Sequence, residues 1–318
     1  MPKTLPALRA RGRLQGDVLF RRGALLAALS IPLLVISTAI ALTWGAALSI
    51  QRFGLSFLFG TTWDPVALKF GALPFIYGTV VSCILSLLIA VPISLGTALF
   101  LSELAPWWLK NPLSFMVELL AAIPSVIFGL WGIFVLSPWI RSFAEPVLKK
   151  TLGFLPFFQG PAYGIGMLAA GLILAIMILP IITAVTRDLF DGTPVPLKEG
   201  AFALGASWWD TVRMVLIPHA RTGILGAVIL GLGRALGETM AVTMVIGNRP
   251  QISLSLFAPA YTIPAVLANE FSEADSNVYL SALIEIGLIL FAITLVVNSV
   301  ARWLIWRTEW GSSKGAGL

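Results

Sequence analysis

Two charged side chains, Arg234 and Glu238, interrupt a long apolar run over 222–247 and lie four residues apart. In a helix, this spacing places both on one face. Arg234 falls near the middle of a hydrocarbon core about 30 Å thick, where a charged side chain costs about 2.5–3.5 kcal/mol. Such a pair is expected to face protein or water and to find partners there.

This pair could have a structural role or could bind an anion. A structural ion pair would fix the rotation of the helix. Alternatively, the guanidinium of Arg234 offers a planar, permanently charged fork for phosphate-type oxygens, and Glu238 could orient it or accept a proton from the anion. Gly223, Ala227 and Gly231 lie on nearly the same stripe and predict the close approach of another helix across a shared pathway.

Bond-making chemistry is not indicated. The sequence holds no G-x-x-x-x-G-K-[ST] phosphate loop and no Gly-Lys dipeptide, so nucleotide binding of that kind is excluded. His219 and Cys83 are the single His and the single Cys, which leaves no metal cluster and no disulfide. The sequence therefore predicts a non-enzymatic protein without a cofactor or a metal.

The composition points to a membrane protein. Of 318 residues, 58% are hydrophobic and 11% charged, against about 25% charged in a typical globular domain. The mean hydropathy is +0.93. Apolar runs of about 20 residues predict an all-α protein with six transmembrane helices, at roughly 24–48, 73–101, 114–137, 163–186, 222–247 and 281–306. The first run is too long for a signal peptide and is interpreted as a retained anchor.

The distribution of charge predicts the orientation. With six spans and the N-terminus inside, the cytoplasmic parts hold 14 Lys and Arg, among them Arg9, Arg11, Arg13 and Lys314, and the outer loops hold six. Positive residues collect on the cytoplasmic side, so both termini are predicted to be cytoplasmic. A seventh candidate, Ile252–Leu267, contains two prolines and is interpreted as a short, broken or re-entrant segment.

Two long outer loops are expected, at roughly 138–162 and 248–280. Both contain prolines and aromatic residues, which suit either interfacial anchoring or a docking surface for an extracytoplasmic partner. The acidic residues Glu118 and Glu285, near the starts of the third and sixth predicted spans, are assigned structural roles.

The cytoplasmic loop at 195–218 carries a more specific pattern. Apolar residues recur at helical spacing on both sides of Gly205, which predicts a short amphipathic helix pair broken at that glycine. The pair would anchor at the membrane surface or dock on a partner protein. Its order of residues resembles the coupling loop of ABC-importer permeases, E-A-A, three residues, G, nine residues, I-x-L-P. The matching positions are Glu199, Gly200, Ala201, Gly205, Val215, Ile217 and Pro218, with Gly200, Val215 and Ile217 departing from the motif. In that family the loop docks on a separate ATPase.

The stretch from Glu199 to Asn248, with the segments 122–129 and 255–259, resembles the phosphate ABC transporter permeases of the PstC type. The resemblance covers about 73–306. It implies the six-span type I (MetI-like) fold in the bacterial inner membrane. It also implies a heterodimer with a PstA-type permease, two copies of a P-loop ATPase and a periplasmic phosphate-binding protein. Arg234 and Glu238 match the family's charged pair associated with phosphate passage.

The resemblance thus implies a permease subunit for inorganic phosphate that works by alternating access. Its expected parts are 1–72 (tail, first span and first outer loop), the core 73–306, and the cytoplasmic tail 307–318. Two alternatives stay open: a permease for another oxyanion such as sulfate or molybdate, and a secondary transporter or channel that needs no ATPase.

Overall fold

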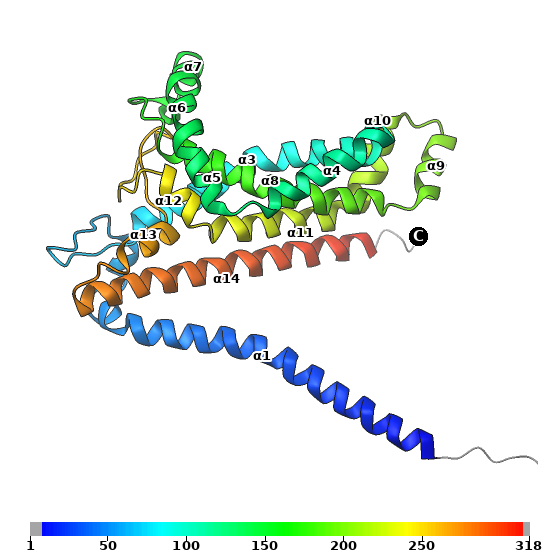
Figure 1. Ribbon diagram of the computed structural model, residues 1–318, viewed down its shortest axis with the longest axis horizontal. Helices are drawn as coiled ribbons and strands as arrows, with labels where there is room; N and C mark the ends of the chain where they lie inside the picture. Colours follow the sequence, from blue (N-terminus) through cyan, green and yellow to red (C-terminus); the bar gives the residue numbers. More distant parts are fainter. Residues whose placement is uncertain (1–7, 314–318) are drawn as a thin grey trace, which may run out of the picture.

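Most long helices of the protein run roughly along one axis, whereas the helical segment 125–152 rises steeply from them (Figure 1). The computed structural model describes residues 8–313, with side chains described for 17–307. In that part, six helices are long and apolar enough to cross a membrane, at Asp17–Phe53, Leu73–Leu104, Ser125–Leu152, Met167–Asp191, Trp208–Leu236 and Asn277–Arg307. The prediction of six spans in an all-α protein is confirmed. The side chains of Arg9, Arg11, Arg13 and Lys314, which were counted for the orientation, lie outside the described residues.

Helix α8 (Met167–Asp191) forms the centre of the bundle, and 67% of its most apolar stretch is buried. The flanking helices are α3 (Leu73–Leu99) and α11 (Ile217–Leu236). Helix α14 (Asn277–Ser313) packs on α11 (Figure 1). The other spans bury no more than a third of their apolar stretches, as expected for helices that face lipid or another subunit.

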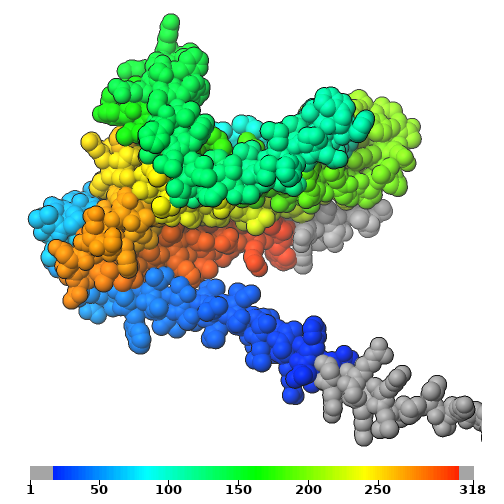
Figure 2. Space-filling view, in the orientation of Figure 1, coloured from blue at the N-terminus to red at the C-terminus, as the bar shows by residue number. Residues whose placement is uncertain are grey.

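Helix α1 (Leu8–Phe53) contacts the bundle near its C-terminal end only, and its first half diverges from α14 (Figures 1 and 2). The contact is polar as well as close. The Ser49 backbone N–H donates to Ser281 Oγ (3.0 Å), and this hydroxyl donates to the Gly45 carbonyl (2.8 Å). A Cβ on Gly45 would lie 2.9 Å from Ile284 Cδ1, so glycine permits the approach of the two helices.

Two predicted spans are not single helices. The run 114–137 is divided between α4 (Trp107–Ala122) and α5 (Ser125–Trp131), and the run 222–247 between α11 and α12 (Met240–Val245). Pro124 accounts for the first break, because proline disfavours the helical conformation of the residue before it. Gly237 ends α11 at the second break.

Wide π turns lie just before prolines, and all of them except Phe100–Leu104 carry a helix through the proline. They occur at Phe100–Leu104, Gly132–Leu136, Ile140–Ala144 and Val212–Leu216. In each case a proline follows two residues after the turn, at Pro106, Pro138, Pro146 and Pro218. A π turn relieves the clash between the proline ring and the carbonyl one turn earlier.

The π turns extend the helix that begins at Ser125 through α6 (Ser137–Trp139) to α7 (Glu145–Leu152). The expectation of an outer loop from 138 is therefore wrong, and the loop begins after Leu152. The buried Glu145 carboxylate fixes this loop by accepting from the Gly164 N–H at 3.1 and 3.2 Å.

The segment Ile252–Leu267 is short and broken, as predicted. Residues 252–262 are non-helical and lead into α13 (Ile263–Glu270). The segment is nevertheless packed into the protein. A Cβ on Gly78 of α3 would lie 2.1 Å from the Tyr261 carbonyl oxygen, so glycine is required at this contact.

The first outer loop contains α2 (Ser56–Phe59) and packs against α13 and α14. Trp63 Nε1 donates to Glu270 Oε2 at 2.8 Å, and the Tyr279 hydroxyl donates to the same oxygen at 2.6 Å. Residues 207 positions apart are thereby joined at the end of the molecule that lies opposite α9 (Val195–Ala203) and α10 (Trp208–Thr211) (Figure 1).

Candidate functional site

Arg234 and Glu238 lie on either side of the end of α11. The helix ends at Leu236, and Glu238 belongs to the break before α12. The expectation that both share one helix face is therefore wrong, because Gly237 ends the helix between them. No ion pair joins the two side chains within the part of the chain that the structure describes. Arg234 is exposed, whereas Glu238 is 8% exposed.

The Glu238 carboxylate is turned toward the start of α12. Its Oε1 accepts from the Ala241 N–H at 3.2 Å. This bond satisfies one of the backbone donors that the first turn of a helix leaves free. Glu238 thus holds the geometry of the break and keeps its carboxylate off the side chain of Arg234.

The two breaks lie on neighbouring segments. A Cβ on Gly129 of α5 would lie 2.4 Å from Met244 Sδ and 3.1 Å from Ala241 Cα. A Cβ on Gly132 would lie 2.7 Å from Val245 Cγ1. Glycine at these two positions lets α5 and α12 pack in direct contact. The two interrupted spans therefore form one unit.

The stripe Gly223, Ala227 and Gly231 packs inside the chain. Cβ atoms on Gly223 and Gly231 would lie 2.5 Å from Leu189 and 2.8 Å from Ile182, both on α8. The close approach is confirmed. The partner is α8 of the same chain, so the expectation that the stripe faces a helix across a shared pathway is wrong.

A different stripe of α11 is uncovered. Cβ atoms on Gly226 and Gly233 would meet no atom within 4 Å, and Leu230 is 59% exposed. These positions and Arg234 follow a helical i, i+4, i+7, i+8 pattern, which defines one face. Within this chain, the guanidinium of Arg234 therefore projects from a face formed mainly by small residues.

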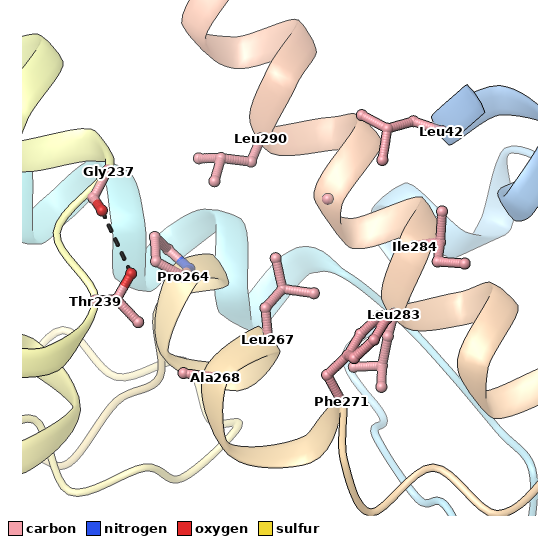
Figure 3. A pocket seen from close by; sticks show the side chains of 11 residues that line it. Leu42, Gly237, Thr239, Pro264, Leu267, Ala268, Phe271, Leu283, Ile284 and Leu290 are labelled. Atoms are coloured by element: carbon pink, nitrogen blue, oxygen red, sulfur yellow. Dashed lines mark hydrogen bonds between the residues drawn. The ribbon is translucent and has the colours of Figure 1, made fainter. Parts of the chain in front are cut away.

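An apolar pocket of about 490 Å³ lies beside the second break (Figure 3). Gly237 and Thr239 form one side of it, and the Thr239 hydroxyl donates to the Gly237 carbonyl at 3.4 Å. Leu42 of α1, Leu267 of α13 and Leu290 of α14 line the opposite side. The break thus has open space on the side of α1 and α14.

The loop at 195–218 folds as the predicted helix pair. Helix α9 ends before Gly205, whose φ is +85°, and α10 follows. The positive φ favours glycine, although there is open space for a Cβ. A capping box between Ser207 and Asp210 starts α10. The pair is a separate element at the end of the molecule (Figure 1).

Apolar side chains point outward from this helix pair. Leu204 is 91% exposed, Trp209 57% and Phe202 48%. Glu199 and Gly200 are exposed too, while Ala201 is half-buried. Since the pair lies at the end of the bundle, this patch fits a partner protein better than lipid tails.

The second half of the coupling pattern is part of a long helix. Helix α10 continues through the π turn into α11, so that Val215, Ile217 and Pro218 lie within one continuous helix from Trp208 to Leu236. This helix ends two residues beyond Arg234.

Ion pairs between neighbouring elements were not anticipated from the sequence. Lys198 of α9 pairs with Glu103 in the π turn that follows α3, and Lys110 of α4 pairs with Asp191 of α8. Glu118 pairs with Arg187 of α8, which agrees with a structural role. Opposite charges far apart in sequence gave no signal, because their pairing depends on how the helices cross.

Comparison with known proteins defines the family. The model of the family described as "Binding-protein-dependent transport system inner membrane component" matches residues 90–309. The chain belongs to this family. As a member, it is a multi-pass protein of the inner membrane and a transport subunit.

Its relatives in the family include proteins named phosphate transport system permease protein PstC. The chain is 50% identical to that of Haemophilus influenzae over 297 residues, which cover 92% of this chain and 94% of the relative. It is 48% identical to that of Mesorhizobium japonicum, with coverage of 92% and 91%. A PstC 2 of Mycobacterium tuberculosis is 41% identical, with coverage of 95% and 96%.

Solved structures confirm the importer permease fold. A chain of a bacterial alginate ABC transporter, bound to a periplasmic protein with an alginate pentasaccharide, gives a TM-score of 0.58 at 18% identity. The match covers 91% of this chain and 96% of the alginate transporter chain. A chain of the inward-facing MetNI methionine ABC transporter gives 0.56 at 17% identity, with coverage of 78% and 99%. The MetI-like fold expected from the sequence is confirmed.

Proposed function

We propose that this chain is the permease subunit of an ATP-driven importer of inorganic phosphate. Its close relation to PstC permeases over more than nine-tenths of its length carries the proposal. The structure adds two supporting features: an exposed Arg234 on α11, and an exposed apolar helix pair whose second member, α10, continues into α11.

The α9–α10 pair is the proposed docking element for a separate ATPase. Burial of exposed side chains such as Leu204 and Trp209 would stabilise the complex. Because α10 runs without interruption into α11, displacement of the docked pair moves the helix that carries Arg234. ATP-driven closure of two ATPase copies would thus open and close the pathway.

The PstA-type permease is the proposed heterodimer partner. It would cover the stripe of Gly226, Leu230 and Gly233, and would enclose a pathway that includes Arg234. There the guanidinium would bind phosphate oxygens through paired, charge-assisted hydrogen bonds. Glu238 lies just beyond the end of the helix that carries Arg234, and its negative charge would keep the anion bound weakly enough for release.

The orientation follows from this proposal. The α9–α10 end is cytoplasmic, as are both termini, and the opposite end with α7 and α13 receives a periplasmic phosphate-binding protein. The core of 73–306 carries the pathway, and residues 1–72 add α1 and the first outer loop to it.

Reconstitution of the complex tests the function. The chain would be purified with a PstA-type permease and the ATPase, placed in proteoliposomes, and supplied with the phosphate-loaded binding protein. We expect ATP-dependent uptake of labelled phosphate that Arg234→Gln reduces at least about a hundredfold, since it removes the positive charge that would bind the anion within the membrane. Arg307→Gln, at the far end of α14, serves as the control with uptake near wild type.

Competing anions decide between the alternatives. If excess sulfate or molybdate suppresses the uptake as strongly as excess unlabelled phosphate does, the protein is a permease for a different oxyanion. Uptake that persists without ATP or without the ATPase would identify a secondary transporter or a channel. Normal uptake by Arg234→Gln would overturn its proposed role.

A further inference from the structure

A polar pocket of about 520 Å³ opens at the end of the molecule opposite the α9–α10 pair. Its walls are two outer segments, 156–163 and 249–259. Arg249 is the one charged residue among those lining it; the other polar side chains belong to Gln159, Tyr163, Gln251, Ser253 and Ser255. A pocket with one cation and no carboxylate favours an anion.

The pocket is fixed by hydrogen bonds between its two walls and within the second one. The Leu256 N–H donates to the Phe157 carbonyl at 2.9 Å, and the Ser255 hydroxyl donates to the Gln159 carbonyl. Gln251 Nε2 donates to the Pro259 carbonyl at 2.9 Å. These bonds engage the side chains of Ser255 and Gln251, and they hold the shape of the pocket before any ligand arrives.

The guanidinium of Arg249 is not used by this framework. Its backbone N–H donates to the Ala260 carbonyl at 3.1 Å, whereas its side chain makes no hydrogen bond or ion pair with the described part of the chain. Two other outer cations are engaged: Lys149 Nζ donates to the Gly160 carbonyl at 3.1 Å, and Arg52 lies over the ring of Phe53. Arg249 thus has five N–H donors available for a ligand.

The pocket is connected to the candidate site through α12. Glu238 precedes this helix and Arg249 follows it, and six helical residues span only about 9 Å. The turn between them is tightly defined. Gly247 has φ +90°, and a Cβ there would lie 2.8 Å from Cβ of Pro259 in the pocket wall.

We propose that this pocket is a second oxyanion site, in which Arg249 binds a tetrahedral oxyanion at the outer end of α12 before it reaches Arg234. The inference rests on the proposed function, which supplies the anion and the direction of transport. The ligand is phosphate in its inorganic form. The anion binds at this site after it leaves the binding protein and before it reaches Arg234 near the middle of the membrane.

Uptake kinetics of the reconstituted complex test the proposal. Initial uptake is measured against the concentration of phosphate-loaded binding protein for wild type, Arg249→Gln and Arg249→Lys. We expect Arg249→Gln to lower the maximal rate roughly tenfold, with an unchanged half-saturating concentration of binding protein, because one charge-assisted pair of bonds is lost. Arg249→Lys should recover much of the rate. Arg52→Gln, an exposed arginine outside the pocket, should match wild type.

Two kinetic results would overturn the proposal. An increased half-saturating concentration with a normal maximal rate would show that Arg249 binds the binding protein itself. Equal kinetics of Arg249→Gln and wild type would show that it has no part in transport. Absence of uptake by the wild-type complex would instead refute the proposed function.

Direct binding gives a readout that does not need transport. Line broadening of millimolar inorganic phosphate in ³¹P NMR is measured on the permease complex without binding protein. Arg234→Gln is used as the background, so that the outer pocket is the remaining site. We expect broadening that excess sulfate reverses and that the Arg234→Gln/Arg249→Gln double variant lacks. Equal broadening by both complexes would overturn the site.

Discussion

Gly129 and Ala241 join the two interrupted spans: a Cβ on Gly129 would lie 3.1 Å from the Cα of Ala241. The contact connects α5 to α12 immediately beyond their breaks. Since Glu238 accepts from the Ala241 N–H at the start of α12, this contact couples α5 to the break between α11 and α12. This coupling depends on the absence of a side chain at residue 129.

Gly129→Ala should therefore destabilise the protein by about 1–3 kcal/mol, the usual cost of overpacking. The new methyl group meets Met244 Sδ at 2.4 Å as well as the backbone of Ala241. Thermal unfolding of the purified chain in one detergent measures the effect. Gly23→Ala on α1, where a Cβ would meet no atom within 4 Å, is the matched control and should not lower the midpoint. Equal midpoints for the two variants would contradict the packing.

The six-span architecture could be predicted because hydropathy reports the length of apolar runs and little else. The breaks at Pro124 and Gly237 fall inside such runs, so a hydropathy window cannot detect them. Pro124 does indicate the first break in the sequence, because proline disfavours the helical conformation of the residue before it. By contrast, Pro138 and Pro146 would have suggested helix ends, yet π turns carry the helix through both positions.

The candidate site shows the same limit at the level of single residues. The four-residue spacing identified Arg234 and Glu238 as unusual for a span, because charge in an apolar run needs no structure to be recognised. Whether they share a face depended on where α11 ends. The helix pair around Gly205 was more predictable, since its turn, cap and spacing are encoded locally.

Substitution can separate the proposed transport role of Glu238 from its structural role. Glu238→Gln keeps a carbonyl oxygen that can accept from the Ala241 N–H and removes only the charge. We expect unchanged thermal stability but phosphate uptake that is about tenfold slower. Without about 1–2 kcal/mol of repulsion from the carboxylate, the anion dissociates more slowly from Arg234. Glu238→Ala should additionally lower stability by about 1 kcal/mol through loss of the capping bond.

Measurement of both variants in the same proteoliposomes distinguishes the two roles. Normal uptake by Glu238→Gln would show that the charge is not used in transport. Equal stability of Glu238→Ala and wild type would show that the hydrogen bond to Ala241 is dispensable.

Leu204→Ser tests the docking role of the α9–α10 pair. Leu204 is 91% exposed in this chain, so its removal should leave the fold unchanged. If it is buried against the ATPase, its loss costs about 1.5–3 kcal/mol of association, at least about tenfold in affinity. The measurement is the amount of ATPase retained when the permease is purified. Val66→Ser, 95% exposed in the first outer loop, is the control. Equal retention by the two variants would argue against docking at this residue.

Glu285 and Ser49 offer a test of how α1 is attached. Glu285 is 6% exposed and its carboxyl lies beside the Ser49 hydroxyl, but neither Glu285 Oε2 nor Ser49 Oγ has a hydrogen-bond partner within the described residues. A buried polar atom without a partner costs about 1–3 kcal/mol. Glu285→Gln has nearly the same shape and brings an N–H that Ser49 Oγ can accept. We expect it to raise stability by about 1 kcal/mol, measured by thermal unfolding.

The double variant identifies the source of that gain. Ser49→Ala removes the acceptor, so Glu285→Gln should stabilise the Ser49→Ala background less than it stabilises wild type, with the difference reporting the new hydrogen bond. A destabilising Glu285→Gln would mean that the carboxyl is satisfied by a group that the amide cannot replace. In that case, the attachment of α1 to α14 would depend on the acid itself rather than on the fit of Gly45 against Ile284.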